Sequence, residues 1–217
     1  MGRSRPGSGE PPASPPPTRL FLVRHGEVDG QGVLHGHVDV PLTPRGVAQM
    51  EAAARALEGE PLAALYCSDL VRSRRGAEII AGGRGVAVRP DPAFRELDMG
   101  RWDGRPFAEL WAEEPDGLRA WWADLEGFTL PGGESMAQLR ERVRAALDAV
   151  LARHRGETLC LVAHGGVNRA ILFDALGLPL ARFHALAQDY GCLNLVEYHA
   201  DGNAVVRLVN ARCPASR

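Results

Sequence analysis

Short segments made almost wholly of apolar residues recur along this chain, and helical patterns separate them. The segments 20–23, 62–67, 86–88 and 159–163 lack the apolar–polar alternation of a strand that has one face in water. Such runs are typical of strands covered on both faces, as in a parallel sheet. Parallel neighbours need a crossover connection, which is usually a helix. The pattern therefore predicts an α/β fold, a three-layer α/β/α sandwich with a mostly parallel central sheet.

Capping signals predict three helices between these strands. Thr43 and Pro44 form an N-cap and a first-position proline, and apolar residues follow at helical spacing to position 57. A longer apolar face begins after Ser135 and continues to position 151. A third helix follows Gly166 and is expected to end at Gly177. Segments 192–199 and 204–209, joined through a turn at 201–203, predict a terminal β-hairpin.

The segment 106–126 has a different pattern. Trp111, Trp121 and Trp122 lie among acidic residues, which indicates short helices that cover something rather than a core strand. One interpretation is ordinary core packing of the indoles. The other is a lid whose indoles wall a substrate pocket.

The chain of 217 residues is long enough for one domain of ordinary size. Residues 1–17 contain six prolines among glycine and serine and no large apolar side chain after Met1, so we expect a disordered leader. The sequence predicts one domain over residues 18–210 and a short tail over 211–217.

Composition and charge exclude several classes of protein. The 25 basic residues, all arginine, nearly balance 27 acidic ones, and no basic stripe predicts a nucleic-acid partner. No apolar run reaches the roughly 18–20 residues of a membrane span, and no secretory signal precedes the domain. The four cysteines, which lie far apart without a C-x-x-C pair, predict neither a zinc site nor a disulfide framework. We therefore expect a soluble cytoplasmic domain with no membrane partner; the sequence predicts no oligomeric state.

Two of the predicted strands end in a histidine followed by glycine. Segment 20–23 leads directly into Arg24-His25-Gly26, and segment 159–163 leads into His164 and a glycine pair. In an open α/β sheet, ligands bind beyond the carboxyl ends of the strands. Glycine allows a ligand to approach the backbone closely, and Arg24 indicates an anionic ligand. The two histidines therefore mark a candidate site at one sheet edge.

Further arginines and a carboxylate follow at positions that lead to the same edge. Residues 68–75, after the strand at 62–67, resemble the first turns of a helix and include Arg72, Arg74 and Arg75. We interpret Arg74 and Arg75 as a solvated helix face. The loop 94–104 supplies Glu96.

Together these segments resemble the histidine phosphatase superfamily, the group of phosphoglycerate mutases, bisphosphatases and acid-type phosphatases. The resemblance covers residues 19–209 and has five parts in the family's order: residues 22–27, the D-x-P-L-T-x-x-G segment 39–46, the arginine segment 70–73, the acid loop of Glu96 with Gly100 and Trp102, and His164-Gly165-Gly166. It implies a phosphoglycerate mutase-like fold.

The resemblance also implies a role for each site residue. His25 would be the phosphate-accepting nucleophile, and Glu96 would be the proton donor. Arg24, Arg72 and His164 would bind the substrate phosphate. Physical chemistry agrees, because phosphoryl transfer needs an aligned nucleophile, positive groups around the phosphoryl oxygens and a proton for the leaving oxygen. Since arginines and histidines supply the positive charge, no metal or other cofactor is expected.

The sequence departs from the family's pattern near the first histidine. Residues 28–36 form a shorter stretch that lacks a frequent asparagine, His35 stands where glutamine is frequent, and Gly76 replaces a frequent threonine. The departures within residues 28–36 concern substrate identity. His35 and His37 could also be a metal-binding H-x-H pair, although no third ligand is near in sequence.

The expected function is a metal-independent phosphatase, a phosphoric monoester hydrolase that acts on a small phosphorylated metabolite through a phosphohistidine intermediate. The short acid loop resembles that of broad-specificity or α-ribazole phosphatases. Phosphoglycerate mutase-type transfer is one alternative. An inactive phospholigand-binding domain and a phosphohistidine-protein phosphatase are two others.

Overall fold

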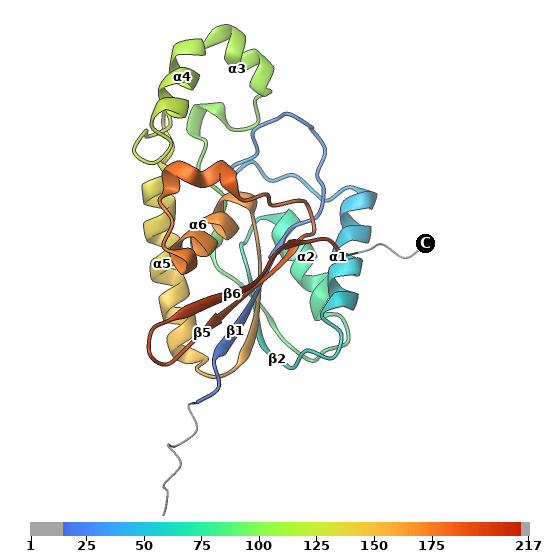
Figure 1. Ribbon diagram of the computed structural model, residues 1–217. Helices are drawn as coiled ribbons and strands as arrows, with labels where there is room; N and C mark the ends of the chain where they lie inside the picture. Colours follow the sequence, from blue (N-terminus) through green and yellow to red (C-terminus); the bar gives the residue numbers. More distant parts are fainter. Residues whose placement is uncertain (1–14, 214–217) are drawn as a thin grey trace, which may run out of the picture.

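A central sheet organises the chain, as Figure 1 shows for the computed structural model, which describes residues 15–213. The six strands of the described part are β1 (Thr18–Arg24), β2 (Leu62–Cys67), β3 (Val88–Pro90), β4 (Thr158–Ala163), β5 (Leu193–Tyr198) and β6 (Ala204–Ala211). Their spatial order is β3-β2-β4-β1-β5-β6. β3, β2, β4 and β1 pair in parallel, and β5 and β6 add an antiparallel hairpin at the other side. The predicted mostly parallel sheet is confirmed.

The predicted leader falls largely outside the described residues, because only its residues 15–17 belong to the described part. These three prolines have no regular secondary structure before β1 begins. The predicted tail 211–217 likewise lies mostly outside the description, which ends at residue 213.

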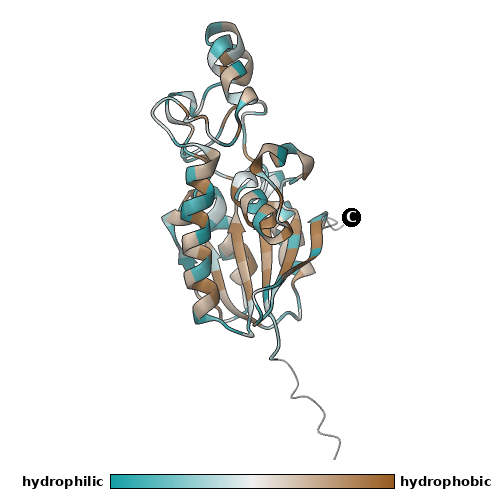
Figure 2. Cartoon of the chain, turned by 60° about the vertical axis from the view of Figure 1, so that its left-hand side comes forward, coloured by the Kyte–Doolittle hydropathy of each residue, from teal (hydrophilic) through white to brown (hydrophobic). Residues whose placement is uncertain are grey.

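Alternate residues of the strands pack on opposite sides of the sheet. Leu20, Leu22 and Leu161 belong to one buried cluster, whereas Phe21 and Val162 belong to the other. Because successive side chains of a strand point to opposite faces, such all-apolar runs require helices on both sides. Figure 2 shows the strands in the brown of apolar residues between helices whose outer surfaces carry hydrophilic colour.

The helices divide between the two faces. The described helical elements are α1 (Pro44–Ala56), α2 (Val71–Ala81), η1 (Pro92–Phe94), η2 (Gly100–Trp102), α3 (Phe107–Glu113), α4 (Pro115–Ala123), α5 (Met136–Arg153), α6 (Gly165–Leu176) and η3 (Leu180–Ala185). α1 and α2 pack on the face of Phe21, and α5 and α6 pack on the face of Leu20. The predicted three-layer sandwich is therefore confirmed.

Local capping chemistry fixes the helix ends as the sequence predicted. Thr43 caps α1 by accepting a hydrogen bond from the Gly46 N–H. Ser135 and Gln138 form a reciprocal capping box at the start of α5. Gly177 ends α6 in the left-handed conformation at φ 64°, which glycine adopts without the cost of a Cβ clash.

One predicted strand was wrongly placed. The sequence predicted a strand at residues 86–88, but β3 covers Val88–Pro90, and its three residues pair with Leu65, Tyr66 and Cys67. The prediction was based on the apolar run, but the register with β2 decides which residues pair. β3 lies at the sheet edge, where the missing N–H of Pro90 breaks no ladder.

The segment 106–126 forms two short helices, α3 and α4, that lie beyond the sheet at the top of Figure 1. Leu110 and Leu118 are fully buried and anchor these helices to the core. Trp111 and Trp122 are 45% and 49% exposed. Short helices were predicted correctly. The core-packing interpretation of the indoles holds for Trp121, which is partly buried against the core, but not for Trp111 and Trp122.

The described cysteines behave as small apolar residues. Cys67, Cys160 and Cys192 are buried and form no disulfide. Burial raises the pKa of the Cys67 and Cys160 thiols to about 12 and that of Cys192 to about 11. Separately, none of the helices between residues 15 and 213 combines the length and the apolar composition that crossing a membrane requires.

The capping box of α5 gives a stability prediction. Ser135→Ala removes the acceptor for the Gln138 N–H at a buried helix start, so the free energy of unfolding is expected to fall by about 0.5–2 kcal/mol. Urea unfolding measures the change. Gln138→Ala removes the reciprocal bond to the Ser135 N–H. The double variant is expected to lose less stability than the sum of the two single losses. Full additivity would contradict a coupled box.

Candidate active site

The carboxyl ends of three neighbouring strands bring His25, Ser68 and His164 together. His25 follows β1, Ser68 follows β2 and His164 follows β4. Because Arg24 pairs with Ala163 in the parallel register of β1 and β4, the next residue of each strand emerges at the same level. The centroids of the two imidazole rings lie 5.0 Å apart in an edge-to-face arrangement.

The backbone selects one tautomer of His25. Its Nδ1 lies 2.8 Å from the carbonyl oxygen of Gly26, which can only accept a hydrogen bond. Nδ1 therefore carries the hydrogen, and Nε2 keeps a lone pair. Burial, followed by the charges of Arg24 and Arg72, lowers the pKa of His25 well below its usual value. The ring is therefore a neutral imidazole at the sheet edge, with a lone pair on Nε2.

His164 is fully buried, and it has one engaged and one free ring nitrogen. Its Nε2 lies 2.7 Å from the Ser68 hydroxyl, whereas its Nδ1 has no hydrogen-bond partner in the described chain. When Ser68 donates to Nε2, Nδ1 carries the hydrogen and can donate to an anion. Burial and the charge of Arg72 lower the pKa of His164 well below its usual value. Sequence reasoning gave Ser68 no role, although its place directly after a strand was a signal.

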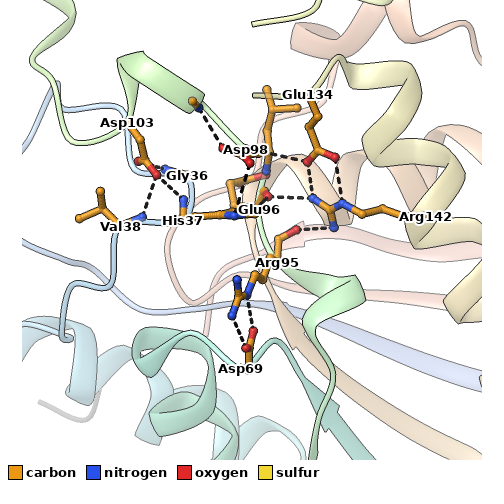
Figure 3. Close-up of polar contacts among 12 residues, drawn as sticks. Gly36, His37, Val38, Asp69, Arg95, Glu96, Asp98, Asp103, Glu134 and Arg142 are labelled. Atoms are coloured by element: carbon orange, nitrogen blue, oxygen red, sulfur yellow. Dashed lines mark hydrogen bonds and ion pairs between the residues drawn. The ribbon is translucent and has the colours of Figure 1, made fainter. Parts of the chain in front are cut away.

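Arg72 is completely buried and held by backbone carbonyls. Its Nη1 donates to the carbonyl of Val38 at 2.8 Å, and its Nη2 donates to that of Gly36 at 2.6 Å. The loop that carries these carbonyls is itself fixed by Asp103, whose carboxylate accepts the N–H groups of residues 36, 37 and 38 at 2.7, 2.6 and 2.8 Å (Figure 3). The Nε of Arg72 has no partner within residues 15–213.

Arg24 is held in a similar way. One terminal nitrogen donates to the Gln188 carbonyl at 2.5 Å, and the guanidinium lies 3.9 Å from the centroid of the Tyr190 ring. Its Nε is buried and has no partner in the described part of the chain. Tyr190 also contacts the His25 ring, at 5.6 Å between centroids. Sequence reasoning missed Tyr190, which lies in a loop without a recognisable pattern.

Within residues 15–213, three buried nitrogens near His25 therefore lack a partner: Nε of Arg24, Nε of Arg72 and Nδ1 of His164. A buried polar group without a partner is costly, so such groups in folded proteins are usually satisfied by a ligand or water. Guanidinium and imidazole N–H groups suit the oxygens of a tetrahedral oxyanion. These three nitrogens can accommodate the oxygens of a phosphoryl group bound in front of His25.

The carboxylate of Glu96 is held beside the start of α6. Its two oxygens accept the N–H groups of Leu97 and Gly166, each at 2.9 Å. A Cβ at position 166 would lie 2.1 Å from the carboxylate, so only glycine allows this approach. The structure thus brings all five residues predicted for the site, His25, Glu96, Arg24, Arg72 and His164, to one edge of the sheet.

A partly buried arginine–glutamate pair fixes the backbone of the acid loop. Arg142 of α5 donates to the carbonyls of Ala93, Arg95 and Glu96 at 2.8–2.9 Å. The same guanidinium makes two hydrogen bonds to Glu134, at 3.0 and 2.5 Å (Figure 3). Sequence reasoning missed both residues, because only the folded chain shows that a helix 46 residues away from Glu96 serves this loop.

The D-x-P-L-T-x-x-G segment has a structural explanation. Asp39 accepts the N–H of Val71 at 2.7 Å, at the start of α2. A Cβ on Gly26 would lie 2.1 Å from the Gly46 carbonyl, so the two glycines let α1 approach the residue after His25. The segment supports the site without adding a charged group to it.

The histidines of the H-x-H pair have separate backbone partners. The Nε2 of His35 lies 2.9 Å from the Asp29 carbonyl, and that of His37 lies 3.0 Å from the Glu96 carbonyl. Across the part of the chain that the structure describes, no cluster of three or more His, Cys, Asp or Glu side chains could hold a metal ion. Arg74 and Arg75 are exposed and lie near Glu78, which confirms the predicted solvated helix face.

Comparisons with known proteins agree on the family. Residues 20–211 match the family model described as histidine phosphatase superfamily (branch 1). A probable phosphoglycerate mutase GpmB of Yersinia enterocolitica is 39% identical over 163 residues, which are 74% of this chain and 76% of that protein. The α-ribazole phosphatase of Shigella flexneri superposes with a TM-score of 0.83 at 26% identity, covering 92% of this chain and all of that one. A mycobacterial glucosyl-3-phosphoglycerate phosphatase complexed with VO3 gives 0.81 at 28% identity, covering 89% and 99%.

The two buried neutral histidines predict a pH dependence of stability. Both have pKa values well below 6.5 in the folded state. The unfolded chain therefore takes up protons below about pH 6.5 that the folded chain does not, so stability is full above that pH and falls as pH decreases. Each histidine contributes a loss of up to about 1.4 kcal/mol per pH unit.

Urea unfolding at about pH 7.5 and about pH 5.5 measures this slope. His25→Asn removes one of the two groups and is expected to make the loss between the two pH values clearly smaller than in the wild type. An unchanged slope in the variant would contradict the assignment of His25 as a buried neutral base.

Proposed function

Because the chain belongs to the histidine phosphatase superfamily, we propose that it hydrolyses a small phosphorylated metabolite through a phosphohistidine on His25. The observation that carries the proposal is the set of three unpartnered buried nitrogens beside the His25 ring. These nitrogens are hydrogen-bond donors without acceptors in the described chain, and the phosphoryl group of a monoester supplies three acceptor oxygens. The relatives named as phosphatases support the reaction class.

In the first step, Nε2 of His25 attacks phosphorus. Its lone pair forms the N–P bond, the bond from phosphorus to the leaving oxygen breaks, and Glu96 in its acid form gives that oxygen a proton. Arg24, Arg72 and His164 donate to the three phosphoryl oxygens, where charge is spread in the transition state. These donors are fixed before the substrate arrives, so little reorganisation accompanies the reaction.

In the second step, water attacks the phosphorus of phosphohistidine. Glu96, now a carboxylate, takes the proton of the water, and the N–P bond breaks so that the electron pair returns to Nε2. Inorganic phosphate and neutral His25 result. The positive charge of the two arginines replaces that of a metal ion, so the reaction is proposed to need no metal or other cofactor.

Phosphoglycerate mutase activity is a second candidate, favoured by the name of the Yersinia relative. A mutase returns the phosphoryl group to a second hydroxyl and keeps water away from phosphohistidine. An assay that follows both inorganic phosphate and the positional isomer, with 3-phosphoglycerate, α-ribazole phosphate and sugar phosphates in EDTA, distinguishes the two reactions. Release of phosphate supports the phosphatase, and isomerisation without release supports the mutase.

The role of His25 gives the first functional prediction. His25→Ala is expected to reduce turnover to background, because it removes the Nε2 lone pair that attacks phosphorus. Wild-type protein denatured during turnover is expected to carry an acid-labile phosphate on His25, detected by mass spectrometry. His199→Ala, near the opposite end of β1, is the control and is expected to keep full turnover. Phosphate trapped on another residue would contradict the assignment. A wild type that binds ligand but shows no turnover would favour a phospholigand-binding domain.

The role of Glu96 gives the second functional prediction. Glu96→Gln keeps the shape of the side chain but has no proton to give, so turnover of an alkyl phosphate is expected to fall by about 10²–10⁴-fold. With p-nitrophenyl phosphate the leaving group needs little protonation, but hydrolysis of phosphohistidine still needs a base. Stopped-flow kinetics should therefore show a burst of p-nitrophenol near one per site, followed by a slow phase. Equal losses with both substrates and no burst would mean that Glu96 only shapes the pocket.

A further inference from the structure

Arg169 is a partly buried arginine that the reaction described above does not use. It lies on α6, one turn after the glycine pair that follows His164. Its Nε donates to the Leu186 carbonyl at 2.7 Å, and its guanidinium lies 4.9 Å from the centroid of the Phe183 ring. Its terminal nitrogens make no hydrogen bond or ion pair within residues 15–213.

The neighbouring arginines of α5 differ from Arg169 in this respect. Arg140 is paired with Asp174, and Arg142 is paired with Glu134. Partly buried guanidinium groups are normally paired, because removing the charge from water is costly. Burial, together with the charge of Arg24, lowers the pKa of Arg169, while the charge of Glu96 opposes that change. Arg169 is therefore a partly buried cation without a counter-ion among residues 15–213.

The position of Arg169 relates it to the phosphoryl site. A Cβ on Gly165 would lie 3.3 Å from Nη1 of Arg169 and 3.5 Å from Nε of Arg24, so both guanidinium groups border the same point. A Cβ on Gly166, the next residue, would touch the carboxylate of Glu96. Arg169 thus borders the phosphoryl site beside Arg24. The carboxylate of Glu96 is near enough for its charge to act on Arg169, so both groups lie on the same side of that site. The leaving group of the substrate must lie on that side, because Glu96 protonates the leaving oxygen.

We propose that Arg169 binds a second anionic group, a carboxylate or a second phosphate, carried by the leaving group of the substrate. The proposal rests on the phosphatase function proposed above and adds the class of substrate. The transferred phosphoryl group already has donors in Arg24, Arg72 and His164, so the free fork of Arg169 is available for another anion. A planar guanidinium with both terminal nitrogens free matches a carboxylate bidentately.

The test compares 3-phosphoglycerate with glycerol 3-phosphate, which differ only in a carboxylate against a hydroxymethyl group. The wild type is expected to prefer 3-phosphoglycerate in kcat/KM. In Arg169→Gln, the ratio of the two kcat/KM values is expected to fall by about 10–100-fold, the size of a charge-assisted hydrogen bond. Arg169→Lys keeps the charge without the fork and should fall in between. Arg153→Gln, at the exposed far end of α5, is the matched control and should leave the ratio unchanged.

Each contrary result has a distinct meaning. Equal losses on both substrates in Arg169→Gln would show that Arg169 only shapes the pocket, and a wild type without preference would show that it contacts no second anion; either overturns the proposal. If the wild type hydrolyses neither compound, the proposed function fails for this substrate class. Calorimetric titration of both compounds into the wild type and Arg169→Gln then decides the role of Arg169, because a loss of binding confined to 3-phosphoglycerate still supports it and any other result overturns it.

Discussion

The parallel, in-register pairing of β1 with β4 is the constraint on which the site depends. It places the residues after Arg24 and Ala163 at the same level of one sheet edge, and the rings of His25 and His164 therefore lie 5.0 Å apart. The pairing is rigid because both strands are buried on both faces between helices. Imidazole rings held by such strands can be oriented before any ligand binds, which is what phosphoryl transfer requires.

Around this pair of histidines, backbone carbonyls fix the position of one arginine, and another arginine fixes the backbone of a loop. Arg72 is fixed by carbonyls of a loop that Asp103 organises, and Arg142 in turn fixes the carbonyls of the loop that carries Glu96. His37 joins the two loops by its contact with the Glu96 carbonyl (Figure 3). Because each guanidinium makes several bonds in a planar geometry, small movements of either loop would break several bonds at once. The network therefore makes the positions of Arg72 and Glu96 depend on each other.

The helices α3 and α4 form a cap beyond the sheet, and the tryptophans in and next to this cap differ in how far they are buried. Trp102, at the end of η2, is fully buried, and its indole N–H donates to Glu114 between α3 and α4, while Arg105 also pairs with Glu114. The cap is thus tied to the loop of Glu96 by a buried aromatic residue. Trp111 and Trp122 lie on the same cap with about half of their surface exposed. Composition alone could not separate these tryptophans, because the difference arises from which side of each helical element packs against the buried cluster.

The sequence by itself predicted the layers, the capped helix ends and the five residues that meet at one edge of the sheet. Apolar runs, caps such as Thr43 and glycines such as Gly177 are local signals, because they act within a few residues of the backbone they control. Only the tertiary structure decided the register of β3, the free nitrogens of Arg24 and Arg72, and the positions of Arg142, Tyr190 and Arg169 around the site. These features depend on contacts between residues far apart in the chain. Which partner satisfies a buried polar group is settled only when all the layers are packed, because a single hydrogen bond decides between a structural arginine and one that is free to bind a ligand.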